Sequence, residues 1–280
     1  RIASNLRPLK IKNFKLDNLR ELLIANLDII IEKRKDGHIV EFDTKKDNEL
    51  QDFTRLGTGS LGGKARGLAF AKNLLSNIEI GKKNQNTIIK IPKIAVIGTD
   101  EFDRFMKEND LNKVAFSKNK NDMDIISKFL KGSINSKLKN TLSKFLDKMT
   151  SPIAIRSSSL LEDSQYQPLS GVYATYMLPN SNRSKSTRLN ELIKAIKLVY
   201  ASTYLKEPSS LIEKSVHRHE EEKMAVIIME LIGKKHQDRF YPSASGLAQS
   251  YNYYPVSYME RNEGVAYLAL GLGRTIAEGD

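Results

Sequence analysis

The chain contains no cysteine among its 280 residues, and this absence removes two kinds of site. Disulfide bonds cannot form, and a metal site built on thiolates is excluded. Histidine is also scarce, with four residues in all. His217 and His219 could share one strand face, but the sequence offers no evident third ligand, so we interpret "HRHEEEK" as a charged surface turn and assign no metal ligands.

Long apolar runs are missing as well. No segment approaches the roughly 20 apolar residues that a membrane helix needs. The first residues, "RIASNLRPLK", include neither a methionine nor an apolar signal segment. We therefore expect a piece of a longer cytoplasmic protein that contacts no membrane. The hydrophobic content of 40% is enough for a sizeable core, in one large domain or two small ones.

Acidic residues are too few to balance the basic ones, with 33 against 45 and a formal net charge of +12. Such a surface is compatible with nucleic acid, anionic lipid or a phosphate-rich small ligand. The excess is mostly lysine, much of it in a helical pattern between Lys107 and Lys148, and no aromatic stacking motif interleaves with it. We interpret it as a solvated face and predict no nucleic-acid partner.

Hydrophobic periodicity alternates between helical and extended segments, which predicts an α/β or α+β fold. Residues 1–53 are expected to be a peripheral lead-in from an upstream region, with a helix at 19–30 and a short strand in "HIVEFDT". Further strands are predicted at Ile94–Ile97, Ile153–Ile155, Lys223–Ile232, "SGLAQSYNYYP" and "EGVAYLALGLG". Further helices are predicted after the glycines near residue 62, from about Glu101 with Thr99 or Asp100 as cap, over Asp122–Met149, and over Arg188–Leu205 after a loop at Arg183–Arg188.

The segment "RLGTGSLGGKARGLAFAKNLL", residues 55–75, is rich in glycine. It matches the dinucleotide-binding pattern G-x-G-x-x-G, but that pattern needs a buried strand directly before it, and "DNELQDFTR" is too polar for one. The phosphate-loop pattern fails at Thr58 and Ala65, and the other motifs of protein kinases are missing. Glycines still let backbone N–H groups approach a ligand, and a helix start attracts anions. With Lys64 in the first helical turn, the segment predicts phosphate binding, and a plain flexible turn is the alternative.

The segment "SPIAIRSSSLLEDSQYQPLSGVYATYM", residues 151–177, brings a lone arginine out of an apolar run. We expect Arg156 just past a buried strand, where its planar fork suits phosphate oxygens. Ser157–Ser159 would add hydroxyl donors. Glu162 and Asp163 could orient the arginine, bind magnesium or cap a helix. A purely structural arginine–carboxylate bridge is the alternative.

Together these two segments resemble the nucleotide-binding domain of the phosphoenolpyruvate synthase and pyruvate phosphate dikinase family. They are similar to its L-G-G-K-x-x-x-L, V-R-S-S, E-D and S-x-x-G-x-x-x-T motifs. "VYASTY", "MAVIIMELI", "SASGLAQS" and "LALGLGRTIAEGD" follow in the family's order. The resemblance covers residues 54–280 and implies a C-terminally truncated, ATP-grasp-like domain of two subdomains, about 54–180 and 181–280.

The resemblance also implies an activity, that of a phosphotransferase using ATP and Mg²⁺. A phosphoryl group would pass from ATP to a histidine on a separate domain, and then to pyruvate on a further domain of the same longer protein. Carried over by motif, the implied catalytic residues are Lys64 and Arg156. The implied nucleotide contacts are these two with Gly171 and Thr175 in a loop over the phosphates, Glu230, Leu231 and Ile232 along adenine, and Ser245 and Gly246 in a phosphate-side hairpin.

The sequence departs from the family pattern in two places. Arg274 follows the "GLG" turn where the family usually has glutamate, and the family's late metal-binding acid and Q-x-R strand lie past Asp280. Two alternatives therefore stay open at this point. One is a non-catalytic, nucleotide-sensing regulatory domain, and the other is a dikinase that acts on a glucan.

Overall fold

The computed structural model describes residues 40–42, 52–77, 89–117, 121–159, 172–206, 208–209, 222–273 and 276. The chain divides into two compact units, residues 1–229 and 230–280. Both contain strands and the first also contains α-helices, so the expected α+β class is confirmed. The predicted subdomain division near residue 180 falls inside the first unit, and the predicted helix at 19–30 lies outside the described residues.

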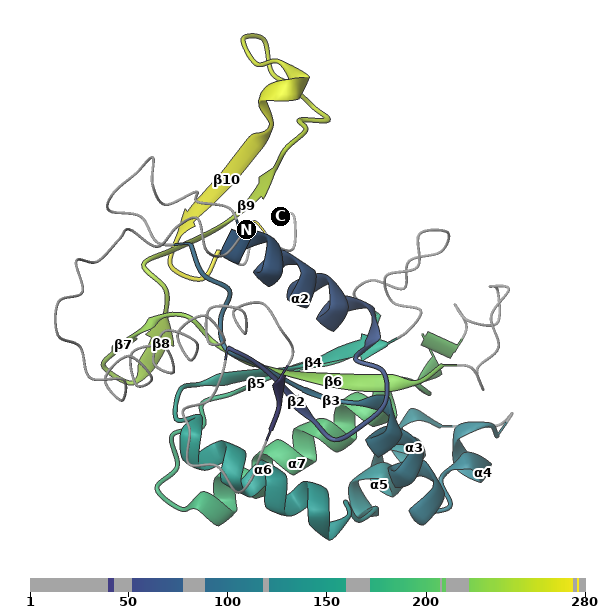
Figure 1. Ribbon diagram of the computed structural model, residues 1–280. Helices are drawn as coiled ribbons and strands as arrows, with labels where there is room; N and C mark the ends of the chain where they lie inside the picture. Colours follow the sequence, from purple (N-terminus) through teal and green to yellow (C-terminus); the bar gives the residue numbers. More distant parts are fainter. Residues whose placement is uncertain are drawn as a thin grey trace, which may run out of the picture. The chain divides into compact units, whose positions relative to one another are not determined.

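A six-stranded sheet forms the centre of the first unit, in the order β1-β2-β3-β6-β4-β5 (Figure 1). Its strands are β1 (Val40–Glu41), β2 (Phe53–Leu56), β3 (Ile94–Ile97), β4 (Ile153–Ser159), β5 (Thr175–Leu178) and β6 (Met224–Glu230). The first three run parallel to one another, whereas β6 is antiparallel to β3 and β5 is antiparallel to β4. The strand predicted at Ile94–Ile97 is confirmed. So is the burial of β6 on both faces, because its first five residues are at most 1% exposed.

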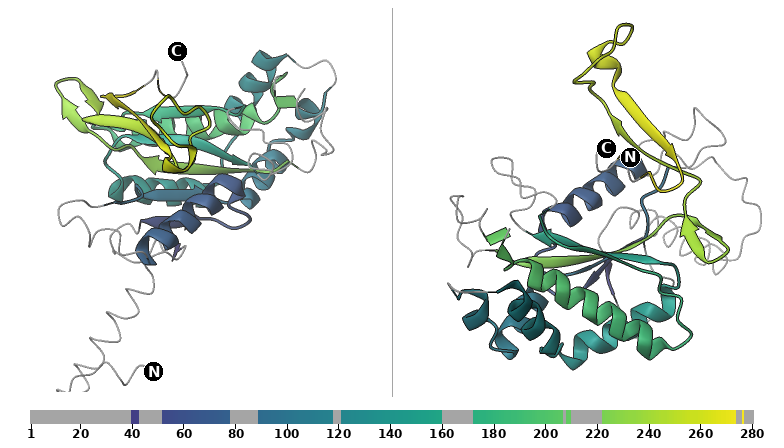
Figure 2. Two further views of the ribbon diagram at one scale, coloured as in Figure 1. Left: turned by 90° about the horizontal axis from the view of Figure 1, so that it is seen from above. Right: turned by 180° about the vertical axis from the view of Figure 1, so that it is seen from behind.

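Helices cover both faces of this sheet. The helix α2 (Gly62–Asn77) lies on one face, and α3, α5, α6 and α7 lie on the other (Figures 1 and 2). The helices of that second face are α3 (Thr99–Glu108), α5 (Asp122–Lys131), α6 (Ser136–Lys148) and α7 (Lys185–Ser202). The short helix α4 (Asn112–Ala115) lies between α3 and α5 in the sequence. Side chains alternate accordingly along each strand: Ile94 and Val96 pack with Ala65 of α2, whereas Ala95 and Ile97 join the larger core on the other face.

The amphipathic segment predicted at Asp122–Met149 is two helices rather than one. The chain leaves helical geometry after Lys131 and re-enters it at Ser136. Asn135 makes the new start favourable because its side chain accepts a hydrogen bond from the backbone of Leu138 at 2.8 Å. The apolar spacing persists across the break, which is why periodicity alone did not reveal it.

Two predicted helix starts are also corrected. Helix α3 begins at Thr99 after Gly98, without a side-chain cap, so neither Thr99 nor Asp100 caps it. The Thr99 hydroxyl instead accepts a hydrogen bond from the Ser60 backbone at 2.9 Å. Helix α7 begins at Lys185, inside the predicted loop, because the Ser184 side chain caps it.

The second unit consists of two hairpins. Strand β7 (Lys234–His236) pairs with β8 (Arg239–Tyr241), and β9 (Ala244–Gln249) pairs antiparallel with β10 (Val265–Leu270). The short 3-10 turn η4 (Arg261–Glu263) precedes β10. The strands predicted in "SGLAQSYNYYP" and "EGVAYLALGLG" are therefore confirmed.

A buried tyrosine in the larger core supplies a stability prediction. The Tyr200 ring packs 5.1 Å from the Phe102 ring, centroid to centroid, but no described group hydrogen-bonds its buried hydroxyl. Burial raises the pKa of that hydroxyl above its ordinary value, so it stays neutral. An unpaired buried hydroxyl costs about 1–3 kcal/mol. We expect Tyr200→Phe to leave the free energy of unfolding in urea unchanged or to raise it by about 1 kcal/mol.

Tyr173 provides the matched control for this prediction. Its hydroxyl is buried too, but it donates a hydrogen bond to the buried Glu222 carboxylate at 3.1 Å. Tyr173→Phe should therefore lower the free energy of unfolding by about 1–3 kcal/mol, because a buried carboxylate oxygen loses its donor. Equal destabilisation by the two variants would contradict the prediction.

Candidate functional site

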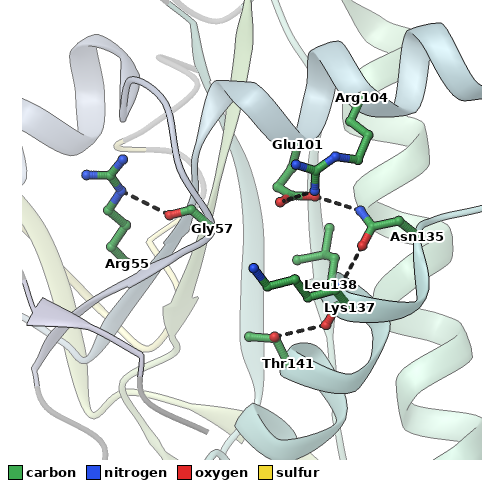
Figure 3. Close-up of polar contacts among 8 residues, drawn as sticks. All are labelled: Arg55, Gly57, Glu101, Arg104, Asn135, Lys137, Leu138 and Thr141. Carbon is green, nitrogen blue, oxygen red and sulfur yellow. Dashed lines mark hydrogen bonds and ion pairs between the residues drawn. The ribbon is translucent and has the colours of Figure 1, made fainter.

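The glycine loop follows a buried strand, contrary to the prediction. Phe53–Leu56 forms β2, and Phe53 and Leu56 are 1% and 0% exposed. The segment "DNELQDFTR" reads as too polar for a strand, yet its last three residues open β2, and the Arg55 side chain turns back along the loop. Its Nε donates to the Gly57 carbonyl at 3.1 Å (Figure 3), and Nη2 donates to the Gly59 carbonyl at 3.0 Å. Arg55 is therefore a residue of the strand, and its side chain holds the glycine loop in place.

The predicted helix after the loop is confirmed as α2, and the loop reaches it through left-handed backbone. Gly57, Gly59 and Gly62 have φ of 77°, 97° and 76°, a region that glycine adopts without strain. The loop is also held from the side of α3, where Thr99 N donates to the Ser60 carbonyl at 3.0 Å. The loop is thus a fixed turn, and the sequence did not reveal the contact with Thr99, which lies 39 residues away.

Strand β4 is longer than predicted. It runs to Ser159, so Arg156 lies within the strand instead of just past it. Ser157, Ser158 and Ser159 are all 0% exposed, so the expectation that they present hydroxyls to a ligand is wrong for this conformation. The sequence did not indicate that the strand continues to Ser159, because three consecutive serines are seldom all buried.

Ser158 joins the two segments that the sequence singled out. Its hydroxyl accepts a hydrogen bond from Ala65 N at 3.0 Å and donates one to the Leu61 carbonyl at 2.8 Å. Ala65 lies in the first turn of α2, so β4 supports the start of this helix directly. A side chain placed at Gly62 would meet the Ser158 carbonyl at 1.8 Å, which shows how closely the two backbones approach.

This contact places the two predicted cations on one side of the sheet. Ile153 and Ile155 face the larger core, so Arg156 and Ser158 face the side that carries α2. Lys64 directly precedes Ala65, the residue that Ser158 supports. Lys64 and Arg156, 92 residues apart in the sequence, thus belong to the two elements that Ser158 joins, on the α2 side of the sheet.

Thr175 belongs to the same face. It is the direct cross-strand partner of Arg156, so both side chains project to the α2 side. Thr175 is exposed and Arg156 is half-buried. No described carboxylate pairs with Arg156. Gly171, Glu162 and Asp163 lie outside the described residues.

The remaining predicted contacts belong to the end of β6 and to the second unit. Glu230 is the last residue of β6, Leu231 and Ile232 follow it, and Ile232 is 61% exposed. In the β9–β10 hairpin, Gly246 opposes Leu268, and the Ser245 hydroxyl donates to the Gly271 carbonyl at 2.5 Å. Ser245 thus ties the "GLG" turn to β9. Arg274, just after that turn, lies outside the described residues.

In the described parts of the chain, no group of three or more histidine, aspartate or glutamate side chains is arranged to hold a metal ion. No helix there has the length and apolar character needed to cross a membrane.

Comparison with known proteins bears on the whole of this region. No curated protein sequence matches the chain. A family model does match, and its description is "Pyruvate phosphate dikinase, AMP/ATP-binding domain". The match runs over residues 58–280, which include the glycine loop from Thr58 onwards, α2, β4 and the described strands of the second unit. The chain therefore belongs to the family of pyruvate phosphate dikinase AMP/ATP-binding domains.

Proposed function

We propose that this chain binds ATP with its phosphates at the start of α2, against Lys64 and Arg156, as the ATP-binding part of a phosphotransferase. The observation that carries this proposal is the pair of hydrogen bonds from Ser158 to Leu61 and Ala65, which fastens the helix start to β4. Backbone N–H groups at a helix start favour phosphate, and both flanking cations share that face.

The chemistry proposed for the two cations is charge neutralisation. Phosphoryl transfer depends mainly on positioning and on stabilising charge on the phosphate oxygens. Arg156 would offer its planar fork and Lys64 a single ammonium, and Thr175 adds a hydroxyl beside the arginine. The described residues include no acidic cluster for magnesium, so we derive no step through the metal.

The rest of the proposed route depends on family membership. Pyruvate phosphate dikinase is the enzyme named by the family, so a histidine on a separate domain is the proposed first acceptor and pyruvate the final one. Glu230, Leu231 and Ile232 are proposed to contact adenine, with Ser245, Gly246 and Gly171 near the phosphates.

Calorimetric titration of the chain with ATP and AMP tests the proposal. We expect saturable binding of both nucleotides and competition between them. Lys64→Ala should weaken ATP binding by about tenfold, because a charge-assisted contact to phosphate contributes about 1.5–3 kcal/mol. Lys72→Ala is the matched control on the same helix, since Lys72 pairs with Asp52 at 3.5 Å instead. Absence of nucleotide binding, or equal effects of the two variants, would refute the proposal.

A further inference from the structure

A cavity of about 730 Å³ opens in the first unit at a place that none of the predicted nucleotide contacts reaches. Gly57 and Thr58 of the glycine loop form one wall, and the outer side of α6 forms another. Glu101, in the first turn of α3, also lines it. Helices α3 and α6 cover the sheet face opposite α2 (Figure 1). Because both helices contribute to its lining, the cavity belongs to that face and not to the face that carries the proposed phosphate site.

The lining of the cavity is rich in basic side chains. Arg55, Lys137, Lys144 and Lys185 all contribute to it. Lys137 extends from α6 towards the side on which Arg55 and Gly57 lie (Figure 3). Within the described residues, its ammonium makes no ion pair. A lining of this kind attracts anions.

The acidic side chains of the lining are already engaged. Glu101 is 5% exposed, and its carboxylate accepts hydrogen bonds from Arg104 at 2.8 Å and from Asn135 at 2.7 Å (Figure 3). Asp147 pairs with Lys185 at 2.5 Å. Each carboxylate is therefore paired with a cation, Arg104 for Glu101 and Lys185 for Asp147, and the basic side chains of the lining outnumber the acidic ones.

The other lining groups favour an organic anion over a bare inorganic one. Thr58, Asn140 and Ser143 present hydroxyl and amide groups, which suit the hydroxyls of a polyol. Phe42 and Leu138 add apolar surface. The volume falls within the usual range for small-molecule sites, about 300–1,000 Å³.

We propose that this cavity is a second ligand site, which binds a small phosphorylated polyol of the sugar phosphate class. The phosphate would lie against Lys137 and Lys144, and the hydroxyls against Thr58, Asn140 and Ser143. The site is distinct from the proposed ATP site and does not depend on it. Because Gly57 and Thr58 begin the loop that ends at α2, the ligand contacts one end of the segment whose other end supports nucleotide phosphates.

The test uses ribose 5-phosphate as the probe, titrated calorimetrically into the complete chain at low salt. We expect saturable binding that the double variant Lys137→Ala/Lys144→Ala weakens by at least about tenfold, since charge-assisted hydrogen bonds are lost. The matched control is Lys131→Ala/Lys194→Ala, which removes two exposed lysines of α5 and α7 that do not line the cavity. This control should change the affinity by less than about twofold.

Three further arms separate the proposal from its rivals. Ribose should not bind measurably, and inorganic phosphate should bind more weakly than ribose 5-phosphate. The variant Arg156→Ala should leave ribose 5-phosphate binding unchanged; loss of binding would place the probe in the nucleotide site and overturn the proposal. No saturable binding of the probe, equal affinity for inorganic phosphate, or equal effects of the two double variants would overturn it as well. None of these results depends on whether ATP binds.

Discussion

Gly62→Ala is expected to lower the free energy of unfolding by about 3 kcal/mol or more, because two costs combine at this position. The backbone has a φ of 76°, which an alanine adopts only at a cost of about 1–2 kcal/mol. The added methyl group would also lie 1.8 Å from the Ser158 carbonyl oxygen. Relieving that clash moves the start of α2 away from β4 and breaks the bond from Ala65 N to Ser158.

Gly67→Ala is the control for this substitution. Gly67 lies on the same helix, and a methyl group there would meet no atom within 4 Å. Alanine is the better helix former by about 1 kcal/mol, so this variant should be as stable as the wild type or more stable. Urea unfolding of both variants measures the difference. If Gly62→Ala unfolds at the same denaturant concentration as Gly67→Ala, the close approach of α2 and β4 is wrong.

The sequence predicted those strands whose residues are apolar throughout. Ile94–Ile97 matches β3, and "MAVIIMELI" matches β6, because unbroken burial leaves no polar residue to obscure the pattern. Strand β2 was missed, since Arg55 reads as a surface residue although it bonds the loop carbonyls. Strand β4 was cut short for a similar reason, because its buried serines read as the residues of a loop.

The sequence predicted the motifs of the candidate site but not the contacts that bring these motifs together. The resemblance of the segments around Lys64 and Arg156 to one family implied that the two act together. The contact that brings them to one face, from Ser158 to Ala65, spans 93 residues. Local periodicity carries no information on contacts of such separation. The cavity beside α6 was missed for the same reason, since β2, the glycine loop, α3 and α6 each contribute a part of it.

The two interpretations of Arg156 predict opposite effects of its removal. If it binds nucleotide phosphates, Arg156→Ala should weaken ATP binding by about tenfold to a hundredfold and slow phosphoryl transfer by about a hundredfold or more. Stability should then change by less than about 1 kcal/mol, because no described carboxylate pairs with this half-buried side chain. If it serves as a buried structural bridge, the free energy of unfolding should fall by about 3–5 kcal/mol instead.

Calorimetry with ATP and urea unfolding of the same variant decide between these outcomes. Arg156→Lys should recover only part of the affinity, because an ammonium replaces the bidentate fork with a single charge. Arg183→Ala is the control, since Arg183 is exposed ahead of α7 and should affect neither measurement. An Arg156→Ala variant that loses stability but keeps its ATP affinity would remove Arg156 from the site. Of the two predicted cations, Lys64 alone would then remain to support phosphate binding at the start of α2.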